Sequence, residues 1–189
     1  MIHSVRFTAV LDTNIMYPVR IRDILFWFAY YGIFTPKWSD DIFDELKDVM
    51  ERKGGTKEQI LKRIKQIDDA FPDAKVGNYQ PLIDNLTLKD KKDRHVLAAA
   101  IKTNANVIVT NNLKDFPKEY LNTFGIAPIS ADDFITNLID LNPKLAVSAF
   151  KEMVLNYTNP DLDEFETVDI LRKNGLEQAA DYLHSQIWF

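Results

Sequence analysis

Val10-Leu11-Asp12-Thr13-Asn14 is the stretch that decides the fold. The apolar residues 7–11 indicate a buried strand, and the carboxylate of Asp12 follows that strand directly. Because burying an ionised carboxylate without partners is costly, we expect Asp12 to face a cleft, a hydrogen-bond donor or a cation at the strand's carboxyl end. Open α/β sheets bind their ligands at that edge. The stretch therefore predicts both a fold class and the position of a functional site.

Helices and strands alternate after this first strand. Ser39 is placed to cap a helix over residues 40–52, and Thr56 with Gln59 matches a capping box that starts another helix. Pro36 is expected to close the second strand. Strands that alternate with helices predict right-handed crossovers and a mainly parallel sheet. The predicted strands cover residues 7–11, 33–35, 75–79, 106–110 and 126–129; predicted helices in the same part cover 20–31, 40–52, a segment from 57 to the residue before Pro72, a segment from Asp93, and 118–123.

The pattern becomes purely helical near residue 130. Pro143, Pro160 and Gly175 separate the predicted helices, which cover residues 132–140, 143–156, 162–173 and 176–187. We therefore expect two parts, an α/β domain over residues 1–131 and a helical C-terminal extension over residues 132–189.

The composition is that of an ordinary globular protein, with 46% apolar and 27% charged residues in a chain of 189. The absence of cysteine excludes disulfides, thiolate nucleophiles and cysteine-ligated zinc. There is no apolar stretch of membrane-spanning length and no pattern of a secretory leader, so no membrane partner and a cytoplasmic location are expected.

The net charge of −5 is unevenly distributed along the chain. Residues 132–189 contain 4 basic and 11 acidic residues, a net charge of −7, and the remainder has a net charge of +2. If a metal site uses four acids of the first part, the rest of that part is basic enough to accept a nucleic-acid backbone. A solvated surface of mixed charge explains the same counts equally well.

Four acidic residues are placed where strand or helix ends could direct them to one sheet edge: Asp12, Glu45, Asp93 and Asp115. Mg²⁺ and Mn²⁺ prefer such hard oxygen ligands. A bound ion of this kind can activate water and stabilise charge on a phosphate, so no cysteine or histidine base is needed. Our hypothesis is a carboxylate-bound metal ion that cuts a phosphodiester backbone.

Each acid also has a purely structural interpretation. Asp12 could form an Asx-turn, Glu45 could be a solvated helix residue, and Asp93 could be a helix N-cap. Asp115 could cap a loop, and Asp90 lies close enough to support or replace Asp93.

Three polar residues could support the acids. Asn14 could hold the carboxylate of Asp12 or form a turn, and Thr110 could orient a phosphate or simply follow its strand propensity. Asn112 could face the metal or cap a loop. His95 is more typical of a packed or capping side chain than of a metal ligand.

Four basic residues could contact RNA phosphates near the cleft: Arg20, Arg22, Lys92 and Arg94. Basic side chains of this kind more often form a solvated face.

Four segments together resemble the PIN-domain ribonucleases. They are residues 10–14, 38–46, 91–100 and 109–117, they occur in the family's order, and the resemblance covers roughly residues 5–130. The chain is most similar to the VapC-like toxins that carry a helical C-terminal extension.

This resemblance implies a parallel sheet of about five strands sandwiched by helices. It assigns the metal and catalytic positions to Asp12, Glu45, Asp93 and Asp115, with Asn14 and Thr110 in supporting positions. It further implies endonucleolytic cleavage of RNA, often tRNA, with Mg²⁺ or Mn²⁺, and inhibition by an antitoxin that occupies the cleft. Many relatives have an acid where this chain has Asn112, and here Asp115 follows it.

Other functions remain open at this stage. The chain could be a PIN-type RNA-processing nuclease without an antitoxin, or a catalytically weak PIN-like module that binds RNA or protein, and it could form a homodimer. A receiver-type phosphoacceptor is disfavoured because no acidic pair precedes Asp12.

Overall fold

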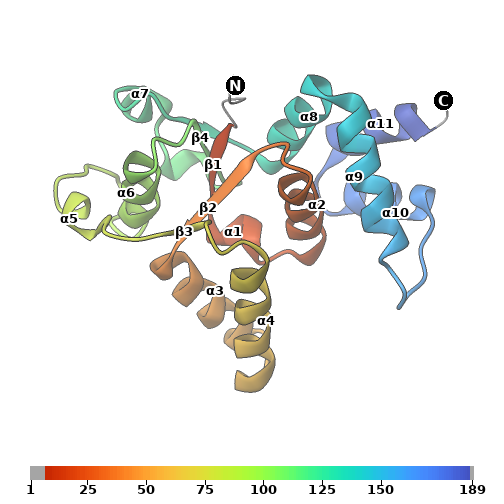
Figure 1. The fold of residues 1–189 in the computed structure, drawn as a ribbon. Coiled ribbons are helices and arrows are strands. Elements are labelled where there is room, and N and C mark those ends of the chain that lie inside the picture. The colour runs from red at the N-terminus through yellow and green to blue at the C-terminus, as the bar shows by residue number, and fades with distance from the viewer. Residues whose placement is uncertain (1–6, 188–189) are drawn as a thin grey trace. The chain divides into compact units, whose positions relative to one another are not determined.

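The computed structural model describes residues 7–187, which form two compact units (Figure 1). The sheet unit, as we call it, comprises Phe7–Tyr17 and Thr35–Ile129. The helical unit comprises Pro18–Phe34 and residues 130–187. The chain therefore leaves the sheet unit after its first strand and a short helix, returns to it for the other four strands and then completes the helical unit.

A five-stranded sheet with the order β3-β2-β1-β4-β5 forms the core of the sheet unit. All neighbouring strands are parallel, so their carboxyl ends meet at the same edge of the sheet. In the central strand, Ala9, Val10 and Leu11 are each fully buried. These findings confirm the predicted parallel α/β fold. The strands are β1 (Thr8–Leu11), β2 (Thr35–Ser39), β3 (Lys75–Val76), β4 (Val107–Val109) and β5 (Ala127–Ile129).

The second strand differs from its prediction. The sequence predicts residues 33–35 closed by Pro36, but β2 continues through the proline. The backbone N–H of Trp38 donates to the carbonyl of Ala74 at 3.1 Å, and the nitrogen of Pro36, two residues earlier, faces the same side. Pairing with β3 begins only at Trp38, so the N–H that Pro36 lacks has no ladder partner to lose.

Local capping signals start the helices of the sheet unit as predicted. The side chain of Ser39 accepts a hydrogen bond from the backbone of Ile42 at 3.3 Å, and Thr56 and Gln59 form the reciprocal capping box. Residues 98–100, all alanines and fully buried, let α6 pack closely on the sheet. The sequence does not predict the one-turn helices α1 and α5. The helices are α1 (Thr13–Met16), α3 (Asp40–Arg52), α4 (Lys57–Ala70), α5 (Gln80–Ile83), α6 (Arg94–Lys102) and α7 (Lys118–Asn122), with a 3₁₀ turn η1 (Leu113–Asp115).

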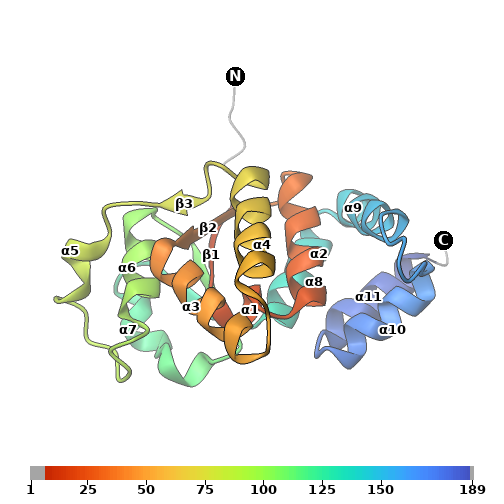
Figure 2. The same ribbon diagram turned by 90° about the horizontal axis from the view of Figure 1, so that it is seen from below.

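The helical unit contains the predicted C-terminal helices and also α2, which packs against α9. The guanidinium of Arg20 lies 4.6 Å from the ring centroid of Tyr157, whose hydroxyl donates to Asp23 Oδ2 at 3.3 Å. Helices α10 and α11 lie side by side (Figure 2). The units do not test the domain boundary at residue 131, which stays a prediction. The helices are α2 (Val19–Tyr30), α8 (Ala131–Leu141), α9 (Pro143–Leu155), α10 (Glu164–Lys173) and α11 (Glu177–Ile187).

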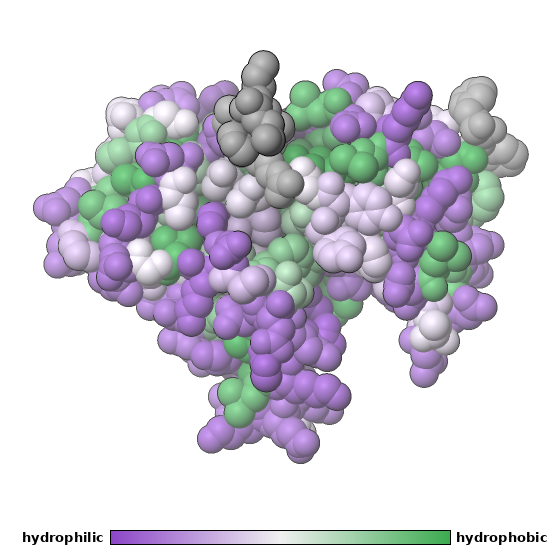
Figure 3. Space-filling view, viewed as in Figure 1, coloured by the Kyte–Doolittle hydropathy of each residue, from purple (hydrophilic) through white to green (hydrophobic). Residues whose placement is uncertain are grey.

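The surface of the α3–α4 hairpin is mainly hydrophilic (Figure 3), although Leu61 is exposed on α4. Every helix among residues 7–187 is too short or too polar to span a bilayer.

Candidate functional site

Asp12 lies at the carboxyl end of β1, as predicted, and only 6% of its surface is exposed. Its Oδ1 accepts a hydrogen bond from the backbone N–H of Thr13 at 2.7 Å and so caps α1. Its Oδ2 accepts from Thr110 Oγ1 at 2.7 Å and from Asn14 Nδ2. Each carboxylate oxygen has more than one lone pair, so capping does not exclude a ligand role for Asp12.

A polar network around Thr110 joins the ends of β1 and β4. The hydroxyl of Thr110 donates to Asp12 and accepts from Asn14 Nδ2 and from the backbone of Asn112, each at 3.0 Å. The backbone of Asn111 donates to Asn14 Oδ1 at 2.9 Å. Asn14 and Thr110 thus lie next to Asp12, and their hydrogen bonds fix the direction of its carboxylate.

Glu45 reaches the same edge from α3, where two side chains hold its carboxylate. Thr13 Oγ1 donates to Oε2 at 2.5 Å, and His95 Nε2 lies 3.0 Å from Oε1. The sequence predicts no contact for Thr13 and a packed or capping side chain for His95. The only sequence signal for these two residues is that they lie close to Asp12 and Asp93. Their hydrogen-bond partner, Glu45, is far away in sequence.

Asp93 occupies the N-cap position of α6, yet its side chain makes no capping hydrogen bond. Its Oδ2 is buried and has no hydrogen-bond partner among the residues that the structure describes. A buried oxygen without a partner carries a desolvation penalty, and a cation would remove it. The capping alternative therefore does not explain the side chain of Asp93.

Burial and like charge shift the two aspartates in the same direction. The pKa of Asp93 is raised to about 6, first by burial and then by nearby carboxylates, of which Asp12 contributes most. The pKa of Asp12 is also raised, chiefly by burial, although hydrogen bonds from Thr110 and Thr13 oppose the shift. The site therefore holds negative charge at a cost that a bound cation would offset.

Glu45 and His95 shift in opposite senses. Burial has the largest single effect on Glu45 and raises its pKa, but the hydrogen bonds from His95 and Thr13 and the charge of His95 together outweigh it, so the pKa is lowered. For His95, burial lowers the pKa, but its hydrogen bond to Glu45 and the charge of that carboxylate outweigh burial and raise it. The pair therefore favours an ionised Glu45.

Asn112 and Asp115 contact each other at the 3₁₀ turn after β4. Asn112 Nδ2 donates to Asp115 Oδ2 at 2.5 Å. Asn112 lines the pocket described below, whereas Asp115 is not among the residues that line it. Asp115 does lie near enough to Asp93 to raise its pKa. The structure thus places Asn112 at the pocket, with Asp115 in contact with its amide.

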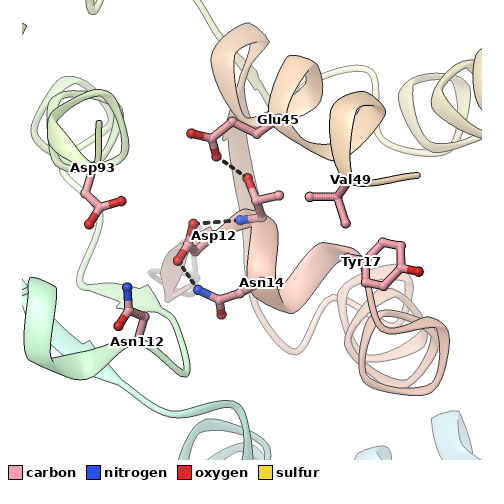
Figure 4. A pocket seen from close by; sticks show the side chains of 8 residues that line it. Asp12, Asn14, Tyr17, Glu45, Val49, Asp93 and Asn112 are labelled. Atoms are coloured by element: carbon pink, nitrogen blue, oxygen red, sulfur yellow. Dashed lines mark hydrogen bonds between the residues drawn. The ribbon is translucent and has the colours of Figure 1, made fainter. Parts of the chain in front are cut away.

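Five of the predicted site residues line one pocket of about 370 Å³, and Thr110 and Asp115 are not among its lining residues. In Figure 4, the carboxylates of Glu45 and Asp93 turn toward Asp12 from different elements. Within residues 7–187, no three His, Asp or Glu side chains converge into a complete metal-ligand set. Because Mg²⁺ usually keeps several of its waters and binds only one or two carboxylates directly, a hydrated ion fits this arrangement. The pocket is lined by Asp12, Thr13, Asn14, Tyr17, Glu45, Val49, Asp93 and Asn112.

The four basic residues predicted to contact RNA lie in different environments. Arg20 belongs to the helical unit and stacks on Tyr157, and Arg22, in the same unit, is only 3% exposed. Because Arg22 is buried, its guanidinium is not accessible to a phosphate. Lys92 and Arg94 flank Asp93, and Lys92 is exposed. Of the four, Lys92 is therefore the exposed residue that lies directly beside a pocket residue in sequence.

Comparisons with known proteins give two family matches and one relative. Residues 8–114 match the family described as PIN domain, and residues 131–185 match the family described as VapC50 C-terminal domain. The chain is 40% identical over 89 residues to VapC50 of Mycobacterium tuberculosis, whose name describes it provisionally as a ribonuclease. This match covers 47% of the chain and 53% of the relative, so the chain spans about half the length of the curated relative that it matches. No solved structure matches the chain significantly.

Proposed function

The chain belongs to the PIN-domain family, and from this premise we propose that it is a divalent-metal-dependent endoribonuclease. We further propose that it is the toxin of a toxin–antitoxin pair, as the match of residues 131–185 to the VapC50 C-terminal domain supports. The proposed substrate is RNA, with tRNA as the first class to test. The proposed location is the cytoplasm, where RNA and an antitoxin would both be present.

One observation carries the proposal of a metal site. The carboxylate of Asp93 has a buried oxygen without a hydrogen-bond partner among the described residues, and it lines the same pocket as Asp12 and Glu45. Unpaired buried carboxylate oxygen is costly, and its cost is removed most directly by a cation. Asp12, Glu45 and Asp93 would hold a hydrated ion, in part through its bound waters, and carboxylate oxygens are ligands that suit Mg²⁺ or Mn²⁺.

When bound, such an ion polarises a phosphoryl oxygen and lowers the pKa of a coordinated water. The chain's own side chains prepare this site. Asp12 presents a carboxylate whose direction is fixed by Thr110 and Asn14. Glu45 is kept ionised, and Asp93 becomes ionised above a pH of about 6. Asp115, which the sequence places among the metal ligands, also accepts a hydrogen bond from Asn112 and would orient that amide beside the site.

The substrate and partner proposals rest on the surroundings of the pocket. Lys92 and Arg94 flank Asp93 in sequence, where basic side chains would attract an RNA backbone. An antitoxin would inhibit the enzyme by covering the pocket. A homodimer is compatible with this proposal, and its presence is checked by measuring the mass of the purified protein in solution.

The proposal is tested by incubating the purified protein with a pool of cellular RNA and Mn²⁺ or Mg²⁺. We expect discrete cleavage that EDTA stops and that Asp12→Ala abolishes. Sequencing the RNA ends produced by wild type and by Asp12→Ala identifies the substrate and the cleavage site. Metal-independent cleavage, or cleavage that persists in Asp12→Ala, contradicts the assignment.

One observation favours a second function, a catalytically weak PIN-like binding module. Asn112 rather than an acid lines the pocket, which removes one negative charge from the site. This alternative predicts RNA or protein binding that Asp12→Asn leaves unchanged. If instead the chain cleaves RNA but no antitoxin inhibits it, an RNA-processing nuclease is the better assignment.

A further inference from the structure

Both oxygens of the Glu45 carboxylate are occupied by donors from other elements. Thr13 Oγ1, in α1, donates to Oε2 at 2.5 Å, and His95 Nε2, in α6, lies 3.0 Å from Oε1. We propose that Thr13 and His95 are positioning residues that fix the Glu45 carboxylate toward the metal pocket. This inference rests on the proposed metal-dependent function.

Glu45 needs such support more than the two aspartates do. Its side chain is 40% exposed and has three rotatable bonds, so on its own it would sample many orientations, several of them directed to solvent. Asp12, in contrast, is short, buried and held by its own turn. A carboxylate must be held in one orientation to contribute fully to a metal site, and outer hydrogen bonds commonly provide that constraint.

The two donors are themselves buried. Thr13 and His95 are each 8% exposed. The hydroxyl of Thr13 has a second acceptor in reach, the carbonyl of Ile42 at 3.5 Å, but the contact with Glu45 is 1 Å shorter and involves a charged acceptor. The donors therefore hold the flexible glutamate rather than being held by it.

The hydrogen bonding of His95 indicates that this histidine serves to bind the carboxylate of Glu45. Its Nδ1 is buried and has no hydrogen-bond partner among the described residues, so Nε2 makes the polar contact of this ring. An apolar side chain of similar size would avoid the penalty for the unpaired Nδ1. Packing between helices does not require a histidine here, whereas holding the carboxylate does.

The positions of the donors explain how three distant acids come to share one pocket. Thr13 directly follows Asp12, and His95 follows Asp93 by two residues. Each hydrogen bond therefore ties Glu45 to a helix whose N-cap residue is one of the other two acids. The pair of bonds fixes the position of Glu45 relative to both aspartates.

The test uses the purified full-length protein and measures Mn²⁺ affinity by calorimetry. His95→Leu and Thr13→Val remove the donors with little change in volume, while His95→Gln and Thr13→Ser retain a donor at nearly the same place. We expect about tenfold weaker Mn²⁺ binding for His95→Leu and for Thr13→Val, as is typical when the partner of a metal ligand is lost. The retaining variants should stay within about threefold of wild type, a smaller loss than that caused by removing the donor.

A cycle with Glu45→Ala separates positioning from a general structural role. If His95 acts through Glu45, adding His95→Leu to Glu45→Ala weakens Mn²⁺ binding no further, whereas an equal loss in both backgrounds overturns the proposal. Failure of His95→Gln and Thr13→Ser to restore binding also overturns it. Thermal unfolding in EDTA shows whether each variant folds, and if His95→Leu does not, the near-isosteric Thr13→Val decides the question through the same cycle. Absence of Mn²⁺ binding by wild type would overturn the proposed function itself.

Discussion

The carboxyl edge of the sheet unit differs from the C-terminal helices α8–α11 in where its charged side chains lie. They are partly buried at the sheet edge and lie at the surface of the helices. At the sheet edge, Asp12 is 6% exposed and Asp93 has a buried oxygen without a partner among the described residues. In the described part of α8–α11, no charged side chain is buried, and ion pairs such as Lys151–Glu164 lie at the surface. Clustered buried charge lowers stability, so it persists where function requires it. The comparison supports a site at the sheet edge and a mainly structural interior in the helices.

The largest effect that this comparison predicts is on activity. Asp93→Asn keeps the shape of the side chain but removes a negative charge from the pocket, and we expect RNA cleavage to fall about 1000-fold because several kcal/mol of metal-dependent stabilisation would be lost. The measurement is single-turnover cleavage of the RNA identified by end sequencing. Asp84→Asn, at an exposed residue outside the pocket, is the control and should cleave normally. Comparable activity in the two variants contradicts a site at this edge.

The second effect is on the stability of the helical unit. Phe150 is fully buried in α9, and Phe150→Ala should lower the free energy of unfolding by about 3 kcal/mol because it leaves a cavity. Leu155→Ala on the same helix is the matched control, since Leu155 is 74% exposed and its truncation should have little effect. Urea unfolding provides the measurement. If Phe150→Ala costs no more than Leu155→Ala, the interior of these helices is not the tightly packed core described above.

Measuring the Mn²⁺ affinity of the same variant tests whether the helices influence the pocket. Folded Phe150→Ala should bind Mn²⁺ as wild type does, because the pocket residues all belong to the sheet unit. Loss of Mn²⁺ binding in the folded variant would show that the helices control the site directly.

The third effect is on stability and depends on pH. Most mutations lower the free energy of unfolding, but here we expect a mutation to raise it. In the folded protein, the pKa of Asp93 is raised from 3.8 to about 6, so the folded state holds this proton more tightly than the unfolded state does. Stability should therefore fall as pH rises from about 4 to about 6, and the penalty should be complete above that range. Asp93→Asn removes the penalty and should stabilise the metal-free protein at pH 7.5 by about 1 kcal/mol, a modest gain because water partly screens this half-buried group.

Urea unfolding in EDTA at pH 4 and pH 7.5 checks this prediction. The gain from Asp93→Asn should be much smaller at pH 4, where the wild-type carboxyl is protonated in the folded state and about half protonated in the unfolded state. A variant that is less stable than wild type at pH 7.5 would indicate that Asp93 has a structural partner. The comparison of the two regions would then lose its main support.

Sequence reasoning succeeded where the determining contacts are local. Ser39 and the pair of Thr56 and Gln59 cap their helices within three residues, and both caps were predicted. The position of Asp12 followed from the strand that precedes it. The parallel sheet followed from the alternation of strands and helices, which the strand order confirms.

The rest depended on contacts between distant parts of the chain. The path of β2 through Pro36 depends on where β3 starts to pair. The hydrogen bonds of Thr13 and His95 to Glu45 span 32 and 50 positions of the sequence, respectively, and no local sequence pattern predicts them. The choice between Asn112 and Asp115 depends on the 3₁₀ turn at Leu113–Asp115, where Asn112 lines the pocket and Asp115 is not among its lining residues.

The smallest effect concerns Arg20, a residue that sequence and structure interpret differently. The sequence suggests contact with RNA, while the structure places its guanidinium 4.6 Å from the ring centroid of Tyr157. Arg20→Gln should therefore lower the free energy of unfolding by about 0.5 kcal/mol, the typical contribution of a partly exposed cation–π contact. Urea unfolding measures this loss, and it should vanish in a Tyr157→Leu background because the ring is then absent. Unchanged stability with weaker, less salt-dependent RNA binding would instead support the interpretation from sequence, because a lost phosphate contact reduces both affinity and its dependence on salt.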